Sequence, residues 1–207
     1  MDKFSRLTAT ACPLEITNLN TDQLVPARYL KWPRSAGLGK GLLQDLRVDA
    51  DGRERPEFPL NRPAWRGAKI IVGGRNFGCG SSREAAVYAL YDYGIRCVIA
   101  PSYGDIFSGN AVQNGLLAAV VSDDEAAEIT AVLVQTPQLA VTVDLEQQTV
   151  LLGNRNYGFS IDPVRRSRLL NGWDDIALTE SYRDRISAFK RDDRARRPWA
   201  TLSPSHE

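Results

Sequence analysis

The part of the chain whose residue types are best suited to chemistry is a turn rich in glycine, serine and arginine, Gly73-Gly74-Arg75-Asn76-Phe77-Gly78-Cys79-Gly80-Ser81-Ser82-Arg83-Glu84. It lies between a predicted strand and a predicted helix, which is where α/β proteins place their ligands. Gly78 and Gly80 leave the backbone bare, two hydroxyls follow, and the guanidinium of Arg83 suits a carboxylate. Free amides at a helix start favour an anion, either a substrate carboxylate or a serine alkoxide. The turn therefore predicts a site for a small diacid.

Two other interpretations of the same residues stay open at this point. Ser81 and Glu84 have the S-x-x-E spacing of a helix capping box, which would give both a purely structural role. The run from Gly78 to Arg83 is also a nucleotide-binding G-x-G-x-x-G without its last glycine, and an arginine there would crowd the helix against its strand. The Gly39-Lys40 pair does not satisfy the phosphate-loop pattern.

Composition excludes several classes of function. The 207 residues carry a net charge of +1 and 43% hydrophobic residues, which gives no broad field for nucleic acid and no apolar run long enough to span a membrane. The single histidine, His206, is the second-last residue of the sequence, so histidine-based catalysis and zinc binding are not expected. Cys12, Cys79 and Cys97 are too scattered for a disulfide framework or a metal site, and they fit a reducing cytoplasm.

The elements that must position the turn follow an α/β pattern. Apolar β-branched runs predict buried strands, and helical stretches separate them as in a parallel sheet. The predicted strands are 8–16, 68–72, 96–100 and 116–121, with a hairpin at 139–145 and 149–152, and the predicted helices are 82–93, 104–113, 123–133 and two within 163–190. We expect one domain over residues 1–190, interrupted by a long mobile loop excursion at 31–66, and a basic, flexible C-terminal tail at 191–207.

Several blocks of the sequence resemble one known family in the same order. They are 77–84, Tyr93-Gly94, 100–107, 114–117, 20–31 and 170–176, and together they span roughly residues 10 to 195. The chain resembles the swivelling domain of the aconitase family, and more closely the separate small subunits of 3-isopropylmalate dehydratases. The resemblance implies an α/β fold of the swivelling β/β/α type found in the aconitase C-terminal domain.

The resemblance also implies a function and a set of site residues. The function would be that of the small subunit of a hydro-lyase that interconverts 2-isopropylmalate and 3-isopropylmalate through 2-isopropylmaleate in leucine biosynthesis. A large partner subunit would carry a [4Fe-4S] cluster, and this chain would bind no cofactor or metal itself. Ser81 would be the catalytic base. The residues implied to bind the small dicarboxylate substrate are Ser82, Arg83, Gly80, Asp22 and Thr21, and those implied to form a specificity loop are Leu30, Lys31, Gly37 and Gly39.

The chain departs from the family pattern at two informative positions. Asn20 stands where aspartate is usual, and Ala85 stands where histidine is usual. Loss of that charge and that imidazole would affect how the active-site groups are oriented. The alternatives are therefore a related aconitase-family dehydratase acting on another substituted malate, or a noncatalytic relative.

Two further groups of residues are assigned structural roles from the pattern. Arg165, Arg166 and Arg168 are predicted to form a solvated helix face. Cys79 is predicted to be a small packing residue, and Cys97 is predicted to lie in the core because it belongs to a buried strand pattern.

Overall fold

The computed structural model describes residues 1–200, and its longest strand, β1 (Arg6–Leu14), organises the sheet. The first half of β1 pairs antiparallel with β5 (Ala140–Asp144), with Leu7 opposite Val143. The second half pairs parallel with β2 (Ile70–Gly73), with Ala11 opposite Ile70. A single strand thus joins a parallel half and an antiparallel half of one sheet.

The sheet has seven strands in the order β4-β3-β2-β1-β5-β6-β7. The remaining strands are β3 (Cys97–Ala100), β4 (Leu117–Val120), β6 (Thr149–Leu152) and β7 (Arg155–Gly158). Strands β1 to β4 are parallel to one another, and β5 to β7 form an antiparallel meander. The predicted α/β alternation is confirmed. Strand β7 was not predicted, because its sequence is polar and an edge strand needs only one buried side chain, here Tyr157.

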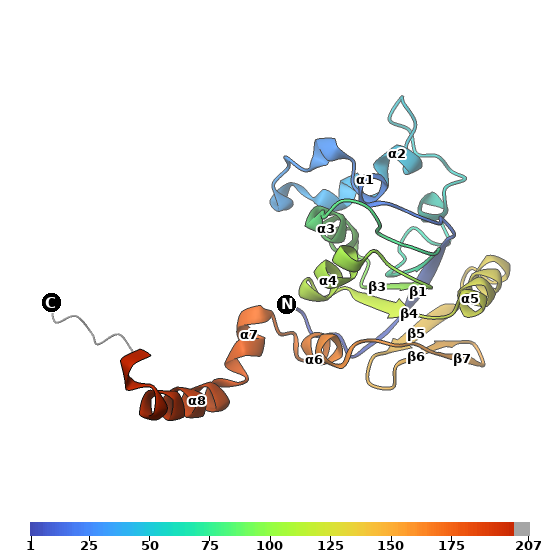
Figure 1. Cartoon of the computed structure of the whole chain (residues 1–207). Helices are drawn as coiled ribbons and strands as arrows, with labels where there is room; N and C mark the ends of the chain where they lie inside the picture. The colour runs from blue at the N-terminus through green and yellow to red at the C-terminus, as the bar shows by residue number, and fades with distance from the viewer. Residues whose placement is uncertain (201–207) are drawn as a thin grey trace. The chain divides into compact units, whose positions relative to one another are not determined.

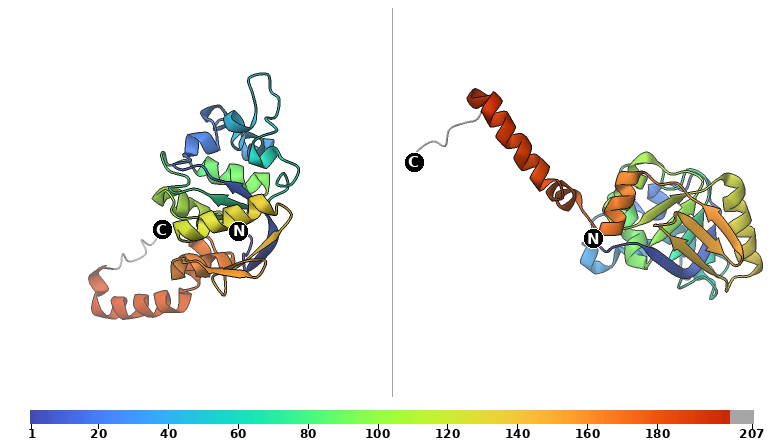
Figure 2. Two further views of the ribbon diagram at one scale, coloured as in Figure 1. Left: turned by 90° about the vertical axis from the view of Figure 1, so that its right-hand side faces the viewer. Right: turned by 90° about the horizontal axis from the view of Figure 1, so that it is seen from below.

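Two hydrophobic clusters lie on opposite faces of the parallel half. On β2, Ile71 packs into one cluster while Ile70 and Val72 pack into the other. A strand covered on both faces needs a continuous apolar run, which is why this segment does not alternate with polar residues. Helix α3 (Glu84–Tyr93) covers the first face and α5 (Asp123–Gln135) the second (Figures 1 and 2). Helix α4 (Asp105–Gln113) contributes residues to both clusters.

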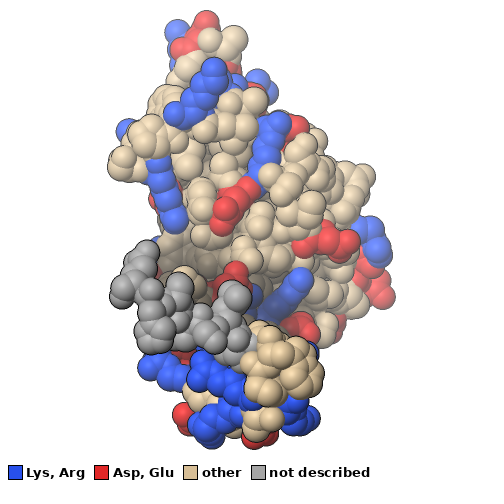
Figure 3. Space-filling model, turned by 60° about the vertical axis from the view of Figure 1, so that its left-hand side comes forward, with Lys and Arg blue, Asp and Glu red and all other residues tan. Residues whose placement is uncertain are grey.

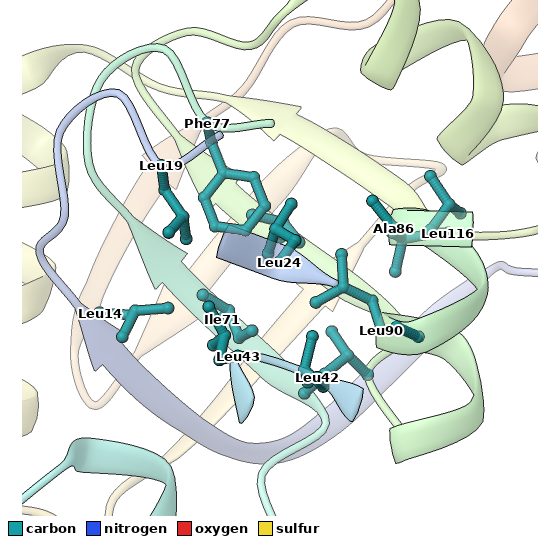
Figure 4. Packing of buried hydrophobic residues seen from close by; sticks show 14 of the residues in the cluster. Leu14, Leu19, Leu24, Leu42, Leu43, Ile71, Phe77, Ala86, Leu90 and Leu116 are labelled. Atoms are coloured by element: carbon teal, nitrogen blue, oxygen red, sulfur yellow. The ribbon is translucent and has the colours of Figure 1, made fainter. Parts of the chain in front are cut away.

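The excursion at 31–66 is folded onto the first face. Its short helical elements, with those just before it, are α1 (Thr21–Leu24), η1 (Ala27–Tyr29), η2 (Arg34–Ala36), η3 (Leu38–Gly41), α2 (Gln44–Arg47) and η4 (Pro59–Asn61). Leu42 and Leu43 are fully buried and belong to the same hydrophobic cluster as Leu90 of α3 (Figure 4). The buried Arg47 is held by Asn61, whose side-chain oxygen accepts from Nε at 3.0 Å. The segment expected to be a mobile loop is therefore part of the core, because its leucines supply one wall of it.

The compact unit ends at Gly172, earlier than the predicted domain boundary at residue 190. Helix α6 (Pro163–Asn171) closes this unit, and Gly172 ends the helix in a left-handed conformation. A second unit begins at Trp173 and contains α7 (Asp175–Glu180), α8 (Arg183–Arg196) and η5 (Pro198–Ala200). The predicted tail boundary thus falls inside α8. His206 and the rest of 201–207 lie outside the described residues.

Helix α8 is unlike the helices of the compact unit in composition. Six of its fourteen residues are basic and three are acidic, and none of them is buried. Figure 3 shows Lys and Arg side chains, in blue, gathered over this helix.

Candidate active site

The glycine–serine–arginine turn follows β2 and is anchored by one aromatic side chain. Phe77 is fully buried, and its ring lies 5.4 Å from the ring of Phe107 on α4. Figure 4 shows Phe77 directed into the core beside Leu19 and Leu24. Gly73 leaves room for this ring, because a Cβ at Gly73 would lie 2.6 Å from a Phe77 ring carbon. The ring fixes where the turn leaves the sheet.

The loop after β3 braces the turn from one side. The amide of Asn76 donates to the Ser102 hydroxyl at 2.8 Å, and the amide of Phe77 donates to the Ser102 carbonyl at 3.0 Å. The amide of Gly104 returns a bond to the Phe77 carbonyl at 3.0 Å. Gly104 is needed for this close approach, since a Cβ there would stand 2.6 Å from the carbonyl oxygen of Gly78.

The start of α1 braces the turn from the other side. The amide of Gly78 donates to the Leu19 carbonyl at 2.7 Å, and the amide of Thr21 donates to the Cys79 carbonyl at 2.9 Å. The Thr21 hydroxyl donates to the Ser81 carbonyl at 3.0 Å. Chain segments sixty residues apart are thereby joined at the carboxyl ends of two neighbouring strands.

Asn20 forms the capping box that begins α1. Its side-chain oxygen accepts from the Gln23 amide at 2.8 Å, and the Gln23 side-chain oxygen accepts from the Asn20 amide at 3.0 Å. An N-cap requires an acceptor oxygen, which asparagine supplies about as well as aspartate. The departure from the family pattern at this position therefore preserves the local structure. Ala85, the other departure, is half-buried and packs against the first hydrophobic cluster.

The structure does not form the capping box that the Ser81–Glu84 spacing left open as an alternative. Helix α3 begins at Glu84 with Arg83 at the N-cap position, and no side chain caps it. The Glu84 carboxylate instead accepts a hydrogen bond from Asn114 at 2.9 Å. Ser81 and Ser82 are exposed, and within residues 1–200 neither hydroxyl has a hydrogen-bond partner. The two hydroxyls are free to meet a ligand.

Arg83 and Asp22 form an ion pair beside these hydroxyls. The Arg83 side chain is 23% exposed and that of Asp22 is 55% exposed, so the pair opens to solvent on the carboxylate side. The guanidinium can present its remaining donors to a second carboxylate. The turn thus combines a free hydroxyl, a positioned guanidinium and the amide end of a ten-residue helix.

The structure brings together most of the predicted site residues but not all. The turn carries Gly80, Ser81 and Arg83, and helix α1 brings Thr21 and Asp22 into contact with them. Gly80 adopts φ +94°, and a Cβ there would lie 3.6 Å from the Cβ of Asn20.

The segment that carries the predicted specificity-loop residues contacts the C-terminal half of α3 through Gly39 and Arg34. Gly39 packs against the C-terminal end of α3, where a Cβ would meet the Tyr93 amide nitrogen at 2.6 Å. Gly37 has a left-handed backbone, whereas Leu30 and Lys31 are exposed. Arg34 fastens this segment to α3, because its guanidinium lies 4.4 Å from the centre of the Tyr88 ring and pairs with Asp92 at 3.0 Å.

The three cysteines do not come together as a metal site. Cys12 and Cys97 are buried in clusters on opposite faces of the sheet, and Cys79 lies on the turn, where its thiol donates to the Asn18 carbonyl at 3.3 Å. Burial raises the pKa of the Cys12 thiol to about 12 and that of Cys97 further still. Within the described residues no group of three or more His, Cys, Asp or Glu side chains could hold a metal ion. The donor set of this chain does not fit an iron–sulfur cluster, which needs several thiolates together.

Some supporting residues were not identified from the sequence. Asn18 and Asn76 both have positive φ, and the Asn76 side chain donates to that of Asn18 at 2.8 Å. Asparagine tolerates this conformation best after glycine, so an asparagine in each of two predicted loops could have indicated a left-handed backbone at these positions. Ser102 lies in the family block 100–107, and its hydroxyl and carbonyl brace the turn.

The arginines of α6 are not simply a solvated face. Arg165 lines a cavity of 520 Å³ beside α4 and donates to the Ser108 hydroxyl at 3.0 Å. Arg166 donates to the carbonyls of Leu145 and Glu146 at the β5–β6 turn. Arg168 is half-buried. The side chains of Arg165 and Arg166 tie α6 to the rest of the compact unit, which is a tertiary role that helix periodicity does not reveal.

Comparison with known proteins agrees with this architecture. The family described as the aconitase C-terminal domain matches residues 1–124. The 3-isopropylmalate dehydratase small subunit of Rhodospirillum centenum is 48% identical over 97% of this chain and 99% of its own length. That of Afipia carboxidovorans is 44% identical over 96% of this chain and all of its own. The crystal structure of 3-isopropylmalate dehydratase LeuD from Methanocaldococcus jannaschii has a TM-score of 0.64 and 25% identity, and covers 89% of this chain and 99% of that one.

A sheet that is parallel on one side of β1 and antiparallel on the other, with a bare turn at the end of β2, defines an aconitase-type swivelling domain. The chain belongs to the aconitase C-terminal domain family and, within it, to the 3-isopropylmalate dehydratase small subunits. The predicted fold class and the family resemblance are both confirmed.

Proposed function

We propose that this chain is the small subunit of a two-subunit hydro-lyase that isomerises 2-isopropylmalate and 3-isopropylmalate through 2-isopropylmaleate in leucine biosynthesis. Sequence identity of 45% and 48% over nearly the whole chain to two proteins of that name supports the proposal. The observation that carries it is the free Ser81 hydroxyl beside the Arg83–Asp22 pair, on a turn braced from both sides. Helix capping, the local alternative, does not occupy this hydroxyl.

In this proposal Ser81 is the general base. Its alkoxide accepts the proton from the carbon next to the one that bears the hydroxyl, the electrons of that C–H bond form the alkene, and the C–O bond breaks to release the hydroxyl. Return of the proton from Ser81 and of hydroxide, each to the other carbon of the alkene, gives the isomer. A serine is a weak base, so its alkoxide needs the positive end of α3 and the Arg83 guanidinium nearby.

Arg83 and Ser82 bind a substrate carboxylate in the same proposal, with the bare backbone of Gly80 alongside. Asp22 holds the guanidinium in place, because the two side chains already form an ion pair. The exposed Leu30 and Lys31 contact the alkyl substituent of the substrate, and Gly37 and Gly39 determine the backbone conformation of the loop that carries them. Arg34 clamps that loop to α3 through Tyr88 and Asp92.

The proposal requires a large partner subunit. Relatives across nearly the whole chain are named small subunits, and the donor set of this chain does not suit a cluster. We therefore assign the [4Fe-4S] cluster to the large subunit. No helix in residues 1–200 is long and apolar enough to cross a membrane, and the net charge of +1 does not favour nucleic acid. The three free thiols suit the reducing cytoplasm, where we place the assembled enzyme.

The departures at Asn20 and Ala85 do not favour a noncatalytic relative. Asn20 retains the capping function at α1, and Ala85 packs into the core. The hydroxyl and guanidinium groups on the turn remain in place.

The decisive experiment mixes this chain with a cluster-loaded large subunit under anaerobic conditions, adds 3-isopropylmalate and follows the absorbance of the alkene. Each chain alone is the control. Absorbance that grows only in the mixture supports the proposal. An unchanged absorbance contradicts the proposal if the same large subunit is active with another small subunit. Other alkylmalates then test the alternative that the chain belongs to a related dehydratase.

A further inference from the structure

We infer that Thr21 is a positioning residue for Ser81, holding the backbone of the catalytic serine through its own hydroxyl. The inference rests on the proposed function and assigns Thr21 a role other than substrate contact. Thr21 is only 2% exposed, and its hydroxyl is occupied by the bond to the Ser81 carbonyl at 3.0 Å. The hydroxyl has no second proton to donate to a substrate carboxylate, and its burial keeps a substrate away from its lone pairs.

The Ser81 carbonyl accepts two hydrogen bonds, one from each direction. The Thr21 hydroxyl approaches from α1, and the amide of Arg83 donates at 2.8 Å from within the turn. A carbonyl oxygen has two lone pairs, so this one is saturated. Its orientation fixes the backbone torsion ψ of Ser81, and the bond from the Thr21 amide to the Cys79 carbonyl fixes the turn two residues earlier. The remaining freedom of the serine side chain is its χ1 rotation.

Such a tether is needed here because the turn has little other support at this point. Ser81 and Ser82 are exposed, and Gly80 at φ +94° has nothing closer than 3.6 Å to a Cβ built there. The bonds from the loop after β3 reach only as far as Phe77, four residues before the serine. Between Phe77 and the start of α3, the turn is held chiefly by α1.

Helix α1 also sets the distance between the base and the cation. Thr21 holds Ser81, while its neighbour Asp22 pairs with Arg83. The capping box of Asn20 and Gln23 fixes the first turn of α1, so the two contacts cannot shift independently. Displacement of a reacting group by about 1 Å can lower a rate by about 100-fold, so loss of the tether should appear in turnover.

The test compares Thr21→Val, which keeps the shape and removes the hydroxyl, with Thr21→Ser, which keeps the hydroxyl. The matched control is Thr130→Val on α5, where the threonine is 5% exposed and the helix packs on the face of the sheet opposite to α1 and α3. Each variant is assayed for kcat and KM with the large subunit. Amide hydrogen exchange is measured on each full chain alone, since that readout requires neither partner nor substrate.

We expect Thr21→Val to lower kcat by roughly 10- to 100-fold with KM changed by less than about 3-fold, and Thr21→Ser to restore kcat to within about 3-fold. Exchange should accelerate at residues 80–83 in Thr21→Val and stay unchanged in β2 and β3. Thr130→Val should match the unmodified chain in both measurements.

Three outcomes would overturn the inference. Full kcat in Thr21→Val despite faster exchange means that the tether does not position the base. A rise in KM alone means that Thr21 contacts substrate. An equal loss of kcat in Thr130→Val means that the effect is one of general stability. Inactivity of the unmodified chain with a competent large subunit would instead contradict the proposed function, and the exchange data would still report on the tether.

Discussion

The close packing of the turn can be tested by adding a single methyl group to it. Gly78 has φ +71°, and a Cβ built there would lie 2.2 Å from Cγ of Phe107 and 2.8 Å from its Cβ. These are the inner atoms of the side chain and cannot move aside as the end of a long chain can. The ring is further confined by Phe77 at 5.4 Å and by Tyr103, stacked at 6.3 Å. We expect Gly78→Ala to destabilise the chain strongly.

The magnitude follows from two separate costs. A left-handed backbone costs a residue with a Cβ about 1–2 kcal/mol. Forcing an extra carbon into a packed core costs about 1–3 kcal/mol more. Gly78→Ala should therefore lower the free energy of unfolding by about 2–5 kcal/mol. Gly80→Ala shares the first cost but not the second, because its Cβ would lie at ordinary van der Waals distances of 3.6 Å from Asn20 and 3.7 Å from Thr21, and it should lose about 1–2 kcal/mol.

A third glycine provides a control of opposite sign. Gly109 lies within helix α4, and nothing stands within 4 Å of a Cβ built there. Gly109→Ala should stabilise the chain by about 0.5–1 kcal/mol, because alanine loses less conformational freedom in a helix. Urea denaturation of the three variants, followed by circular dichroism, measures each change. Equal losses at Gly78 and Gly80, or a loss at Gly109, would refute the reasoning from packing.

Three further predictions concern the site and the core. Ser81→Ala should abolish turnover while affinity for the large subunit, measured by calorimetry, stays within about 3-fold; normal turnover would remove Ser81 from the mechanism. At pH 8 a thiol reagent should label only Cys79 in the native chain and all three cysteines in urea. Burial raises the pKa of Cys12 to about 12, which leaves about one thiolate in ten thousand at this pH, and it raises the pKa of Cys97 still higher. Rapid labelling of all three thiols in the native chain would contradict this prediction. Tyr103→Phe should lower the free energy of unfolding by about 1–3 kcal/mol, since its buried hydroxyl lies 2.8 and 2.9 Å from carbonyls of β3 and β4; an unchanged urea midpoint would show that the hydroxyl adds no stability.

The sequence by itself determined the elements and the residue types of the site. Each predicted parallel strand has its counterpart in the structure, because a short β-branched run bounded by turn residues has few other solutions. The groups that the turn offers to a ligand could also be predicted from the sequence, because Ser81, Ser82 and Arg83 are adjacent in the chain and need no tertiary contact to come together. Ordered motif blocks over almost the whole chain identified the family.

Tertiary contacts decided which of the local possibilities was realised. Ser81 and Glu84 satisfied a capping pattern, but hydrogen bonds from α1 hold the Cys79 and Ser81 carbonyls, and the helix begins only at Glu84. The glycine- and proline-rich excursion appeared mobile from composition, yet its leucines at 42 and 43 are buried against α3. The pairing of Asp22 with Arg83, across sixty residues of chain, likewise depends on how the ends of β1 and β2 meet. Composition and periodicity report what a segment can do alone, whereas these outcomes depend on the free energy of contacts between segments distant in sequence.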